Sequence, residues 1–284
     1  MMKDSIRTIF FLCVFAGFVF SCTKNNGNST TTPPPVTPGF TLSYGDSIFF
    51  VQNTAADYII TPKQTAAGVY SGFPEGIEID EKTGAVNVSK SETGLRYRIS
   101  FKPANGTDTF STLIVIGGIN FIDGFYKLTG KDSILTPVYN ANKANAIPGS
   151  NGATIFDEGS GCNSAGCNVN TALGSINLAQ TVRNGVFGAK PSNNDRHEFQ
   201  LNYRIDDKSG KALNTLKVKL YYFDSVSDVT QEVYDIISSR DGTLLRQNAA
   251  GPLPAAFPSV VNGRTDNINK AAKPRPPCIF ILAR

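Results

Sequence analysis

Residues 95–116 read LRYRISFKPANGTDTFSTLIVI and contain two short segments of alternating residues on either side of an Asn-Gly pair. In the first segment, polar residues alternate with the apolar residues Leu95, Tyr97, Ile99 and Phe101. A period of two is typical of a strand with one buried face, and Asn105-Gly106 favours a tight turn. The stretch therefore predicts two antiparallel strands, the second at residues 109–116.

The same kind of pattern recurs on both sides of this hairpin. Upstream, residues 77–80 alternate, and the turn that follows ends at Gly84, a residue suited to positive φ. Downstream, residues 199–205 and 216–222 alternate around a polar turn and predict a second hairpin. Shorter strands are expected at residues 124–128 and 278–282. The chain therefore reads as mainly β.

One segment shows helical spacing. Ser227 precedes Val229, Val233, Ile236 and Ile237, which fit one face of a helix. Ser227 could cap this helix and Gly242 could end it, whereas a strand over residues 232–238 is the alternative, because Val, Tyr and Ile favour strands. We therefore expect at most one or two short helices in the second half of the chain.

A family resemblance rests on three motifs. Residues 73–80 (FPEGIEID), 82–86 (KTGAV) and 93–106 (TGLRYRISFKPANG) resemble the core motifs of Ig-like and cadherin-like domains of bacterial surface proteins. The resemblance implies a β-sandwich of the seven-stranded type at residues 40–120, with a spacer or adhesion role. The acidic calcium motifs of cadherins are missing and do not carry over. Residues 121–284 resemble no family and are expected to form a second β-rich domain.

The N-terminus has the anatomy of a secretory signal. Residues 1–22 read MMKDSIRTIFFLCVFAGFVFSC, in which a short basic start precedes an apolar run that is shorter than a permanent transmembrane helix of roughly 20 residues. Val19-Phe20-Ser21-Cys22 resembles the lipobox of bacterial lipoproteins. It implies a lipoprotein signal peptide at residues 1–21 and acylation of Cys22 with palmitate. An ordinary signal peptide with an incidental Cys is the alternative.

The residues after the lipobox predict a tether and a location. Residues 22–39 are rich in Asn, Thr and Pro and contain almost nothing that could be buried, which is typical of a spacer. Cys22 is not followed by Asp, nor by the acidic run that resembles a surface-export signal in Bacteroidota lipoproteins. We therefore expect a lipid anchor in the outer membrane, facing the periplasm or the cell surface, with the bilayer as the partner of Cys22.

Composition excludes several function classes. The 284 residues carry a formal net charge of +4, too mild to indicate a nucleic-acid partner. The single His excludes a mechanism or metal site that needs two imidazoles from one chain. The positive charge gathers near the C-terminus, where one acidic residue, Asp266, accompanies the basic residues Arg264, Lys270, Lys273, Arg275 and Arg284.

Three thiols remain outside the leader. Cys162 and Cys167 are separated by four residues in a loop rich in Gly and Asn, and a disulfide between them would stiffen that loop in an oxidising compartment. The alternative is a zinc site made of Cys162, Cys167, Cys278 and His197. We expect the bridge, no metal and no cofactor.

Two further features bear on function. Tyr221 and Tyr222 are adjacent on a predicted strand, so one ring should face outward, where it could contact a glycan. The carboxylate groups could serve a glycoside hydrolase, which needs only two suitably spaced carboxyls; they are Asp157, Glu158, Asp206, Asp207, Asp224, Asp228 and Glu232. A solvated surface is the expected role of most of them.

These features together favour a membrane-anchored cell-envelope lipoprotein, in which the β domains form a non-enzymatic binding or adhesion module for a glycan, a protein or an envelope component. The alternatives are a carboxylate-dependent, glycosidase-like hydrolase in residues 121–284 and a purely structural surface protein.

Overall fold

The computed structural model describes residues 39–129, 133–149, 151–239 and 275–284. The chain is mainly β, as the alternating patterns predict. The described residues contain three short α-helices, one more than the upper limit that the sequence suggested. Residues 33–284 belong to one compact unit, so the predicted division of this part of the chain near residue 120 stays a prediction.

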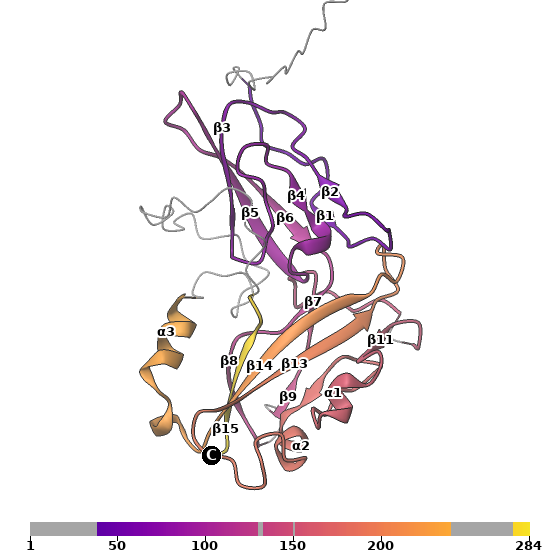
Figure 1. Ribbon diagram of the computed structural model, residues 1–284, viewed down its shortest axis with the longest axis vertical. Coiled ribbons are helices and arrows are strands. Elements are labelled where there is room, and N and C mark those ends of the chain that lie inside the picture. Colours follow the sequence, from indigo (N-terminus) through magenta and orange to yellow (C-terminus); the bar gives the residue numbers. More distant parts are fainter. Residues whose placement is uncertain (1–38, 130–132, 150, 240–274) are drawn as a thin grey trace, which may run out of the picture. The chain divides into compact units, whose positions relative to one another are not determined.

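The first sheet is built around the hairpin of residues 95–116. Its strands, in spatial order, are β1 (Ile48–Phe49), β6 (Phe110–Ile116), β5 (Leu95–Pro103) and β3 (Gly68–Phe73) (Figure 1). β5 and β6 are antiparallel, with Leu95 opposite Ile116 and Phe101 opposite Phe110, which confirms the predicted hairpin. β1 pairs with β6 in parallel.

A two-stranded sheet of β2 (Ile59–Ile60) and β4 (Val86–Asn87), followed by the 3-10 helix η1 (Val88–Lys90), completes this region. Six strands lie within described residues 40–118, where the resemblance implied a sandwich of the seven-stranded type. The enclosed core includes the fully buried side chains of Tyr70, Val86, Tyr97, Ile99 and Phe101.

Two local features stabilise the turn between residues 79 and 86. Gly84 has φ +70°, and a Cβ at this position would lie 2.7 Å from the Tyr70 ring, so the turn needs glycine. The Asp80 carboxylate accepts hydrogen bonds from the N–H groups of Lys82 and Thr83 at 2.9 and 2.7 Å. Both features hold the turn between residues 79 and 86 that the sequence predicts.

The second sheet combines strands from the beginning and the end of the C-terminal half. In spatial order its strands are β11 (Ile155–Phe156), β13 (Asp195–Arg204), β14 (Asn214–Phe223), β15 (Cys278–Leu282) and β8 (Gly124–Lys127). β13 and β14 form the predicted antiparallel hairpin. β15 runs parallel to both β14 and β8, so the C-terminal strand lies inside the sheet rather than at its edge.

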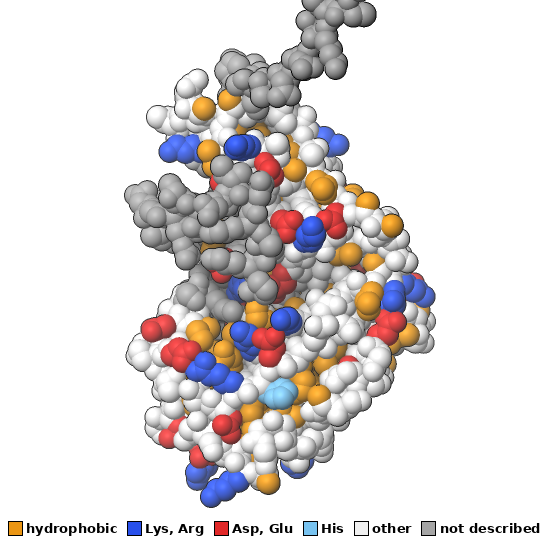
Figure 2. Space-filling view, viewed as in Figure 1, with side chains coloured by type: hydrophobic (Ala, Val, Ile, Leu, Met, Phe, Trp, Pro, Cys, Tyr) orange, Lys and Arg blue, Asp and Glu red, His pale blue; other side chains and the backbone are white. Residues whose placement is uncertain are grey.

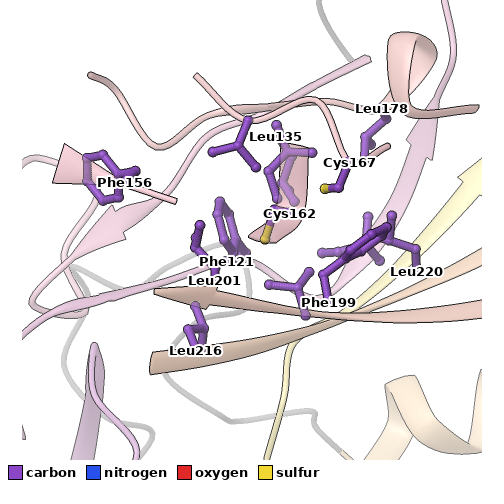
Figure 3. Close-up of a cluster of buried hydrophobic side chains, with 14 of the residues drawn as sticks. Phe121, Leu135, Phe156, Cys162, Cys167, Leu178, Phe199, Leu201, Leu216 and Leu220 are labelled. Carbon is purple, nitrogen blue, oxygen red and sulfur yellow. The ribbon is translucent and has the colours of Figure 1, made fainter. Parts of the chain in front are cut away.

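Both faces of this sheet are covered. On one face lies the largest apolar cluster, which contains Phe121, Leu201 and Leu220 (Figure 3). On the other face, α3 (Gln231–Ser239) packs Val233 against Phe280 and its neighbours. The helical interpretation of this segment is therefore right and the strand alternative is wrong. The helix begins at Gln231, after a 3-10 turn, η3 (Val226–Asp228), rather than at Ser227; Gly242 lies outside the described residues.

Several small elements complete the C-terminal half. They are β7 (Ile119–Asn120), β9 (Ile134–Leu135), β10 (Val138–Tyr139), α1 (Gly161–Ser164), β12 (Ile176–Asn177) and α2 (Leu178–Arg183). β7 pairs with β10, and β9 pairs with β12. Residues 140–171, a stretch rich in Asn, Gly, Ala and Ser, contain α1 and β11, and the side chains of Phe156, Cys162 and Cys167 enter the core.

A buried polar network joins the two cores. The hydroxyls of Thr93 and Tyr203 lie 2.6 Å apart, and both residues are buried. The N–H group of Arg275 donates to the Glu92 carboxylate at 2.6 Å, and the Arg275 guanidinium pairs with Asp123 at 3.0 Å. These bonds connect segments that precede residue 94 with segments that follow residue 119, and unpaired buried polar groups would be costly there.

Candidate functional site

The predicted anchor and tether, residues 22–39, lie almost wholly outside the described residues, and acylation of Cys22 therefore stays a prediction. No helix within the described ranges is long and apolar enough to span a membrane. Of the C-terminal basic residues, Arg275 is only 5% exposed because it pairs with Asp123. The positive charge of Arg275, one of the basic residues near the C-terminus, is therefore part of a buried ion pair.

The structure brings Cys162 and Cys167 together. Both are buried free thiols, and Figure 3 shows their sulfur atoms within the same apolar cluster. A hydrogen bond with Cys167 and burial raise the pKa of the Cys162 thiol far above its usual range. Cys162 also donates to the carbonyl of Gln200 at 3.3 Å. The structure holds the two side chains as free thiols in one cluster, and the disulfide stays a prediction.

The zinc alternative is wrong for this set of residues. Cys162 and Cys167 lie in the cluster on one face of the second sheet, whereas Cys278 packs beside Tyr221 on the opposite face. His197 lies on β13 against the ring of Phe199, with ring centroids 4.4 Å apart. The sheet itself separates the thiols, and the described residues contain no group of three or more potential metal ligands.

The predicted aromatic platform at Tyr221 and Tyr222 is also wrong. The two side chains are 5% and 7% exposed, because neighbouring residues of a strand point to opposite faces and both faces are covered. Tyr222 packs against Phe187, with ring centroids 5.8 Å apart. Tyr221 packs against Phe280 at 4.9 Å and lies beneath Arg196, and burial raises the pKa of Tyr221 to about 12.

The ring contact between Tyr221 and Phe280 continues to an exposed aromatic pair, Phe125 and Tyr234. The ring of Phe280 is 5.5 Å from that of Phe125 on β8, which is 6.0 Å from that of Tyr234 on α3. Phe125 and Tyr234 are each 39% exposed, and their rings are inclined at 52°. No local spacing in the sequence identifies this pair, because the contact between β8 and α3 joins positions 109 residues apart.

The ion pair of Arg196 and Glu232 attaches α3 to β13. Two oxygens of the Glu232 carboxylate accept from the guanidinium, at 3.0 and 2.6 Å. The hydrogen bond from Arg196 lowers the pKa of Glu232 and raises that of the guanidinium. Positive and negative side chains are interspersed over the face shown in Figure 2, without a broad field of one sign.

The carboxylates proposed for hydrolysis have structural partners. The Asp157 carboxylate accepts from the N–H groups of Cys162 and Asn163 at 2.7 and 2.9 Å, and so satisfies the start of α1. Glu158 pairs with Arg204. The other members accept hydrogen bonds or form ion pairs with neighbours as follows: Asp206 with Lys211, Asp207 with Tyr139, Asp224 with Tyr222, Asp228 with Ser225, and Glu232 with Arg196.

Comparisons with known proteins give no family assignment. No protein-family model matches the sequence, and no curated protein is significantly similar to it. Among solved structures, human protocadherin-24 EC1-2 matches 64% of this chain and 94% of its own, with 12% identity and a TM-score of 0.24. Drosophila N-cadherin EC1-4 matches 64% of this chain with 13% identity and a TM-score of 0.21, and this chain spans about half of it, 48%. At these TM-scores the similarity carries no argument, and the β class rests on the strands themselves.

Proposed function

We propose that this chain is a lipid-anchored lipoprotein of the bacterial cell envelope, held in the outer membrane by acylated Cys22. The lipobox-like sequence at residues 19–22 and the apolar run before it support the anchor. Two or three acyl chains on one Cys give stable attachment, since one chain alone binds marginally. Residues 22–39 would then serve as the spacer between the bilayer and the β modules.

We further propose that the β modules bind a glycan of the envelope without catalysing a reaction, and that Phe125 and Tyr234 form the contact. The observation that carries this proposal is the exposure of two adjacent aromatic rings, 39% each, on a fixed base. Phe280 backs Phe125, so little side-chain freedom is lost when a ligand packs on it. An aromatic face offers an apolar surface to the C–H groups of a sugar ring, and the Tyr hydroxyl adds a polar contact.

The glycan proposal is tested with a glycan array probed by the chain from residue 22 onward, with Cys22→Ser to prevent acylation. We expect a subset of glycans to bind, and the double variant Phe125→Ala/Tyr234→Ala to bind them at least 10-fold more weakly. Leu173→Ala is the matched control, because Leu173 is exposed and distant in sequence from both rings. Binding that the double variant leaves unchanged, or an array with no bound glycan, would refute this part.

The anchor is tested separately by palmitate labelling in cells. The wild-type chain should incorporate label and partition with membranes, whereas Cys22→Ala should do neither. Cys13→Ala is the control, since Cys13 belongs to the predicted signal and should be removed with it. Equal labelling of wild type and Cys22→Ala would contradict the lipoprotein assignment.

A further inference from the structure

The N-terminal part of β14 is not paired with β15 along the edge that the two strands share. β15 pairs with β14 only from Lys219 to Phe223, although β14 begins at Asn214. The N–H group of Lys219 donates to the carbonyl of Pro277 at 3.0 Å, on the side of β15. Because alternate residues of a strand direct their backbone groups to the same side, the N–H and C=O groups of Thr215 and Lys217 face this side too.

Among the described residues, the C-terminal segment does not continue the ladder along this edge. In the parallel register, the carbonyl of Lys217 would accept from the backbone nitrogen of Pro277, which carries no hydrogen. The carbonyl of Thr215 would accept from the N–H group of Arg275, which instead donates to the Glu92 carboxylate at 2.6 Å. Within the described ranges, neither Thr215 nor Lys217 forms a backbone hydrogen bond on this side.

This edge borders a groove with a volume of about 340 Å³. The segments Leu213–Lys217 and Ser89–Thr93 line the groove, together with Pro276. Val51 and Leu213 give the groove apolar surface, and Leu213 is 48% exposed.

One polar side chain of the groove lining has a buried atom without a partner in the part of the chain that the structure describes. Asn214, which lines the groove, is 6% exposed, and its Oδ1 atom has no hydrogen-bond partner among the described residues, while its Nδ2 atom donates to Ala212.

We propose that the groove receives an extended peptide segment of a partner protein, which adds to β14 as a short strand at Thr215 and Lys217. Four backbone groups at a spacing of two residues match the main-chain pattern of a strand, which is the basis of recognition by strand addition. The segment Leu213–Lys217 would accommodate a strand of roughly five residues, or about 17 Å. Apolar side chains at alternate positions of the peptide would pack on Val51 and Leu213.

A strand partner explains the features of the groove better than a saccharide does. The backbone N–H and C=O groups of Thr215 and Lys217 recur every second residue, which matches the backbone of a strand. The hydroxyls of a sugar chain do not have this regular spacing of donors and acceptors. The aromatic pair at Phe125 and Tyr234 is not part of the groove. This inference therefore goes beyond the glycan proposal and stands or falls independently of it.

The test begins with a phage library of random nonapeptides, selected on the chain from residue 22 onward with Cys22→Ser, followed by synthesis of the enriched peptide. We expect enrichment of peptides with alternating apolar residues. Amide hydrogen exchange followed by NMR should show that the N–H groups of Thr215 and Lys217 exchange at least 10-fold more slowly with the peptide bound than without it.

Two variants locate the site. Lys217→Pro removes the N–H group that faces the groove and no hydrogen bond of the ladder with β13, although the proline ring also restricts the backbone of β14; peptide affinity should fall at least 10-fold. Lys217→Ala is the matched control and should keep affinity within about threefold, because the backbone carries the contact. Leu213→Asp places a charge on the apolar wall without touching the ladder, and should weaken binding at least fivefold even if Lys217→Pro fails to fold.

Several outcomes would overturn the proposal: no enriched peptide, a bound peptide that leaves the exchange of both amides unchanged, or Leu213→Asp binding with wild-type affinity. Protection of these amides by an array glycan instead of a peptide would also overturn it. The double variant Phe125→Ala/Tyr234→Ala should bind the peptide normally, so loss of glycan binding and loss of peptide binding are distinguishable.

Discussion

Replacing Tyr203 with Phe removes one hydroxyl from the contact between the two cores. This hydroxyl lies 2.6 Å from the Thr93 hydroxyl and accepts from the N–H group of Ile119 at 3.2 Å. All three residues are buried. Burial raises the pKa of Tyr203 to about 12, so the hydroxyl stays protonated under ordinary assay conditions. The ring is retained, and its stacking on Phe156 at 5.9 Å should persist without a cavity.

The expected loss follows from the groups left unpaired. A buried polar group without a partner costs about 1–3 kcal/mol. The N–H group of Ile119 cannot turn away, whereas the Thr93 hydroxyl can rotate, so we expect a total loss of about 2–4 kcal/mol in the free energy of unfolding. Thr93→Val removes the other hydroxyl. The double variant should therefore lose less than the sum of the two single variants, by about 1 kcal/mol or more.

Urea unfolding of the chain from residue 22 onward, monitored by circular dichroism, measures these differences. Tyr126→Phe is the matched control: the Tyr126 hydroxyl donates to the carbonyl of Ile122 at 2.8 Å in a partly exposed place, so its loss should cost about 1 kcal/mol or less. A loss below about 0.5 kcal/mol for Tyr203→Phe, or strictly additive effects in the double variant, would refute the argument that this buried bond joins the cores.

Three further predictions concern single contacts. Asp123→Asn should cost about 3–5 kcal/mol in urea unfolding, because it leaves the charge of Arg275 buried without its carboxylate; a cost below 1 kcal/mol would contradict this. Oxidation of Cys162 and Cys167 to a disulfide should raise the free energy of unfolding by about 2 kcal/mol, because it closes a short ring. The melting temperature of the wild type should then fall when the disulfide is reduced, whereas that of Cys167→Ser should not change. Two free thiols found by mass spectrometry after export would contradict this prediction. Glu232 has a lowered pKa, so its carboxylate stabilises the fold above its ordinary pKa of 4.5, and this contribution is lost as the pH falls through the folded-state value. The melting temperatures of wild type and Glu232→Gln should therefore differ at pH 7 and converge as the pH falls below the folded-state pKa of Glu232, and a difference that is independent of pH would exclude this role.

Much of the fold could be predicted from local patterns. The period of two at residues 95–101 and 199–205 identified both hairpins, because a strand with one buried face imposes that alternation on the sequence itself. The spacing of Val229, Val233 and Ile236 likewise predicted the helix. The starting residue of that helix was wrong, since the 3-10 turn η3 uses the serine that could have capped it.

The candidate site could not be predicted in the same way. The adjacent positions of Tyr221 and Tyr222 on one strand predict that their rings point to opposite faces of the sheet. They do not predict whether other elements cover each face. α3 covers one of them, and this same packing brings Tyr234 beside Phe125 and creates the exposed pair.

The sequence by itself determined the β class, the two hairpins, the helix and the expectation of a lipid anchor, because each depends on residues close together in the chain. Only the tertiary structure decided that β15 lies inside the sheet, that the described part of the C-terminal segment pairs with β14 only from Lys219 onward, and that Arg275 is buried. These features depend on contacts between segments far apart in the chain, and no local pattern encodes which segments meet.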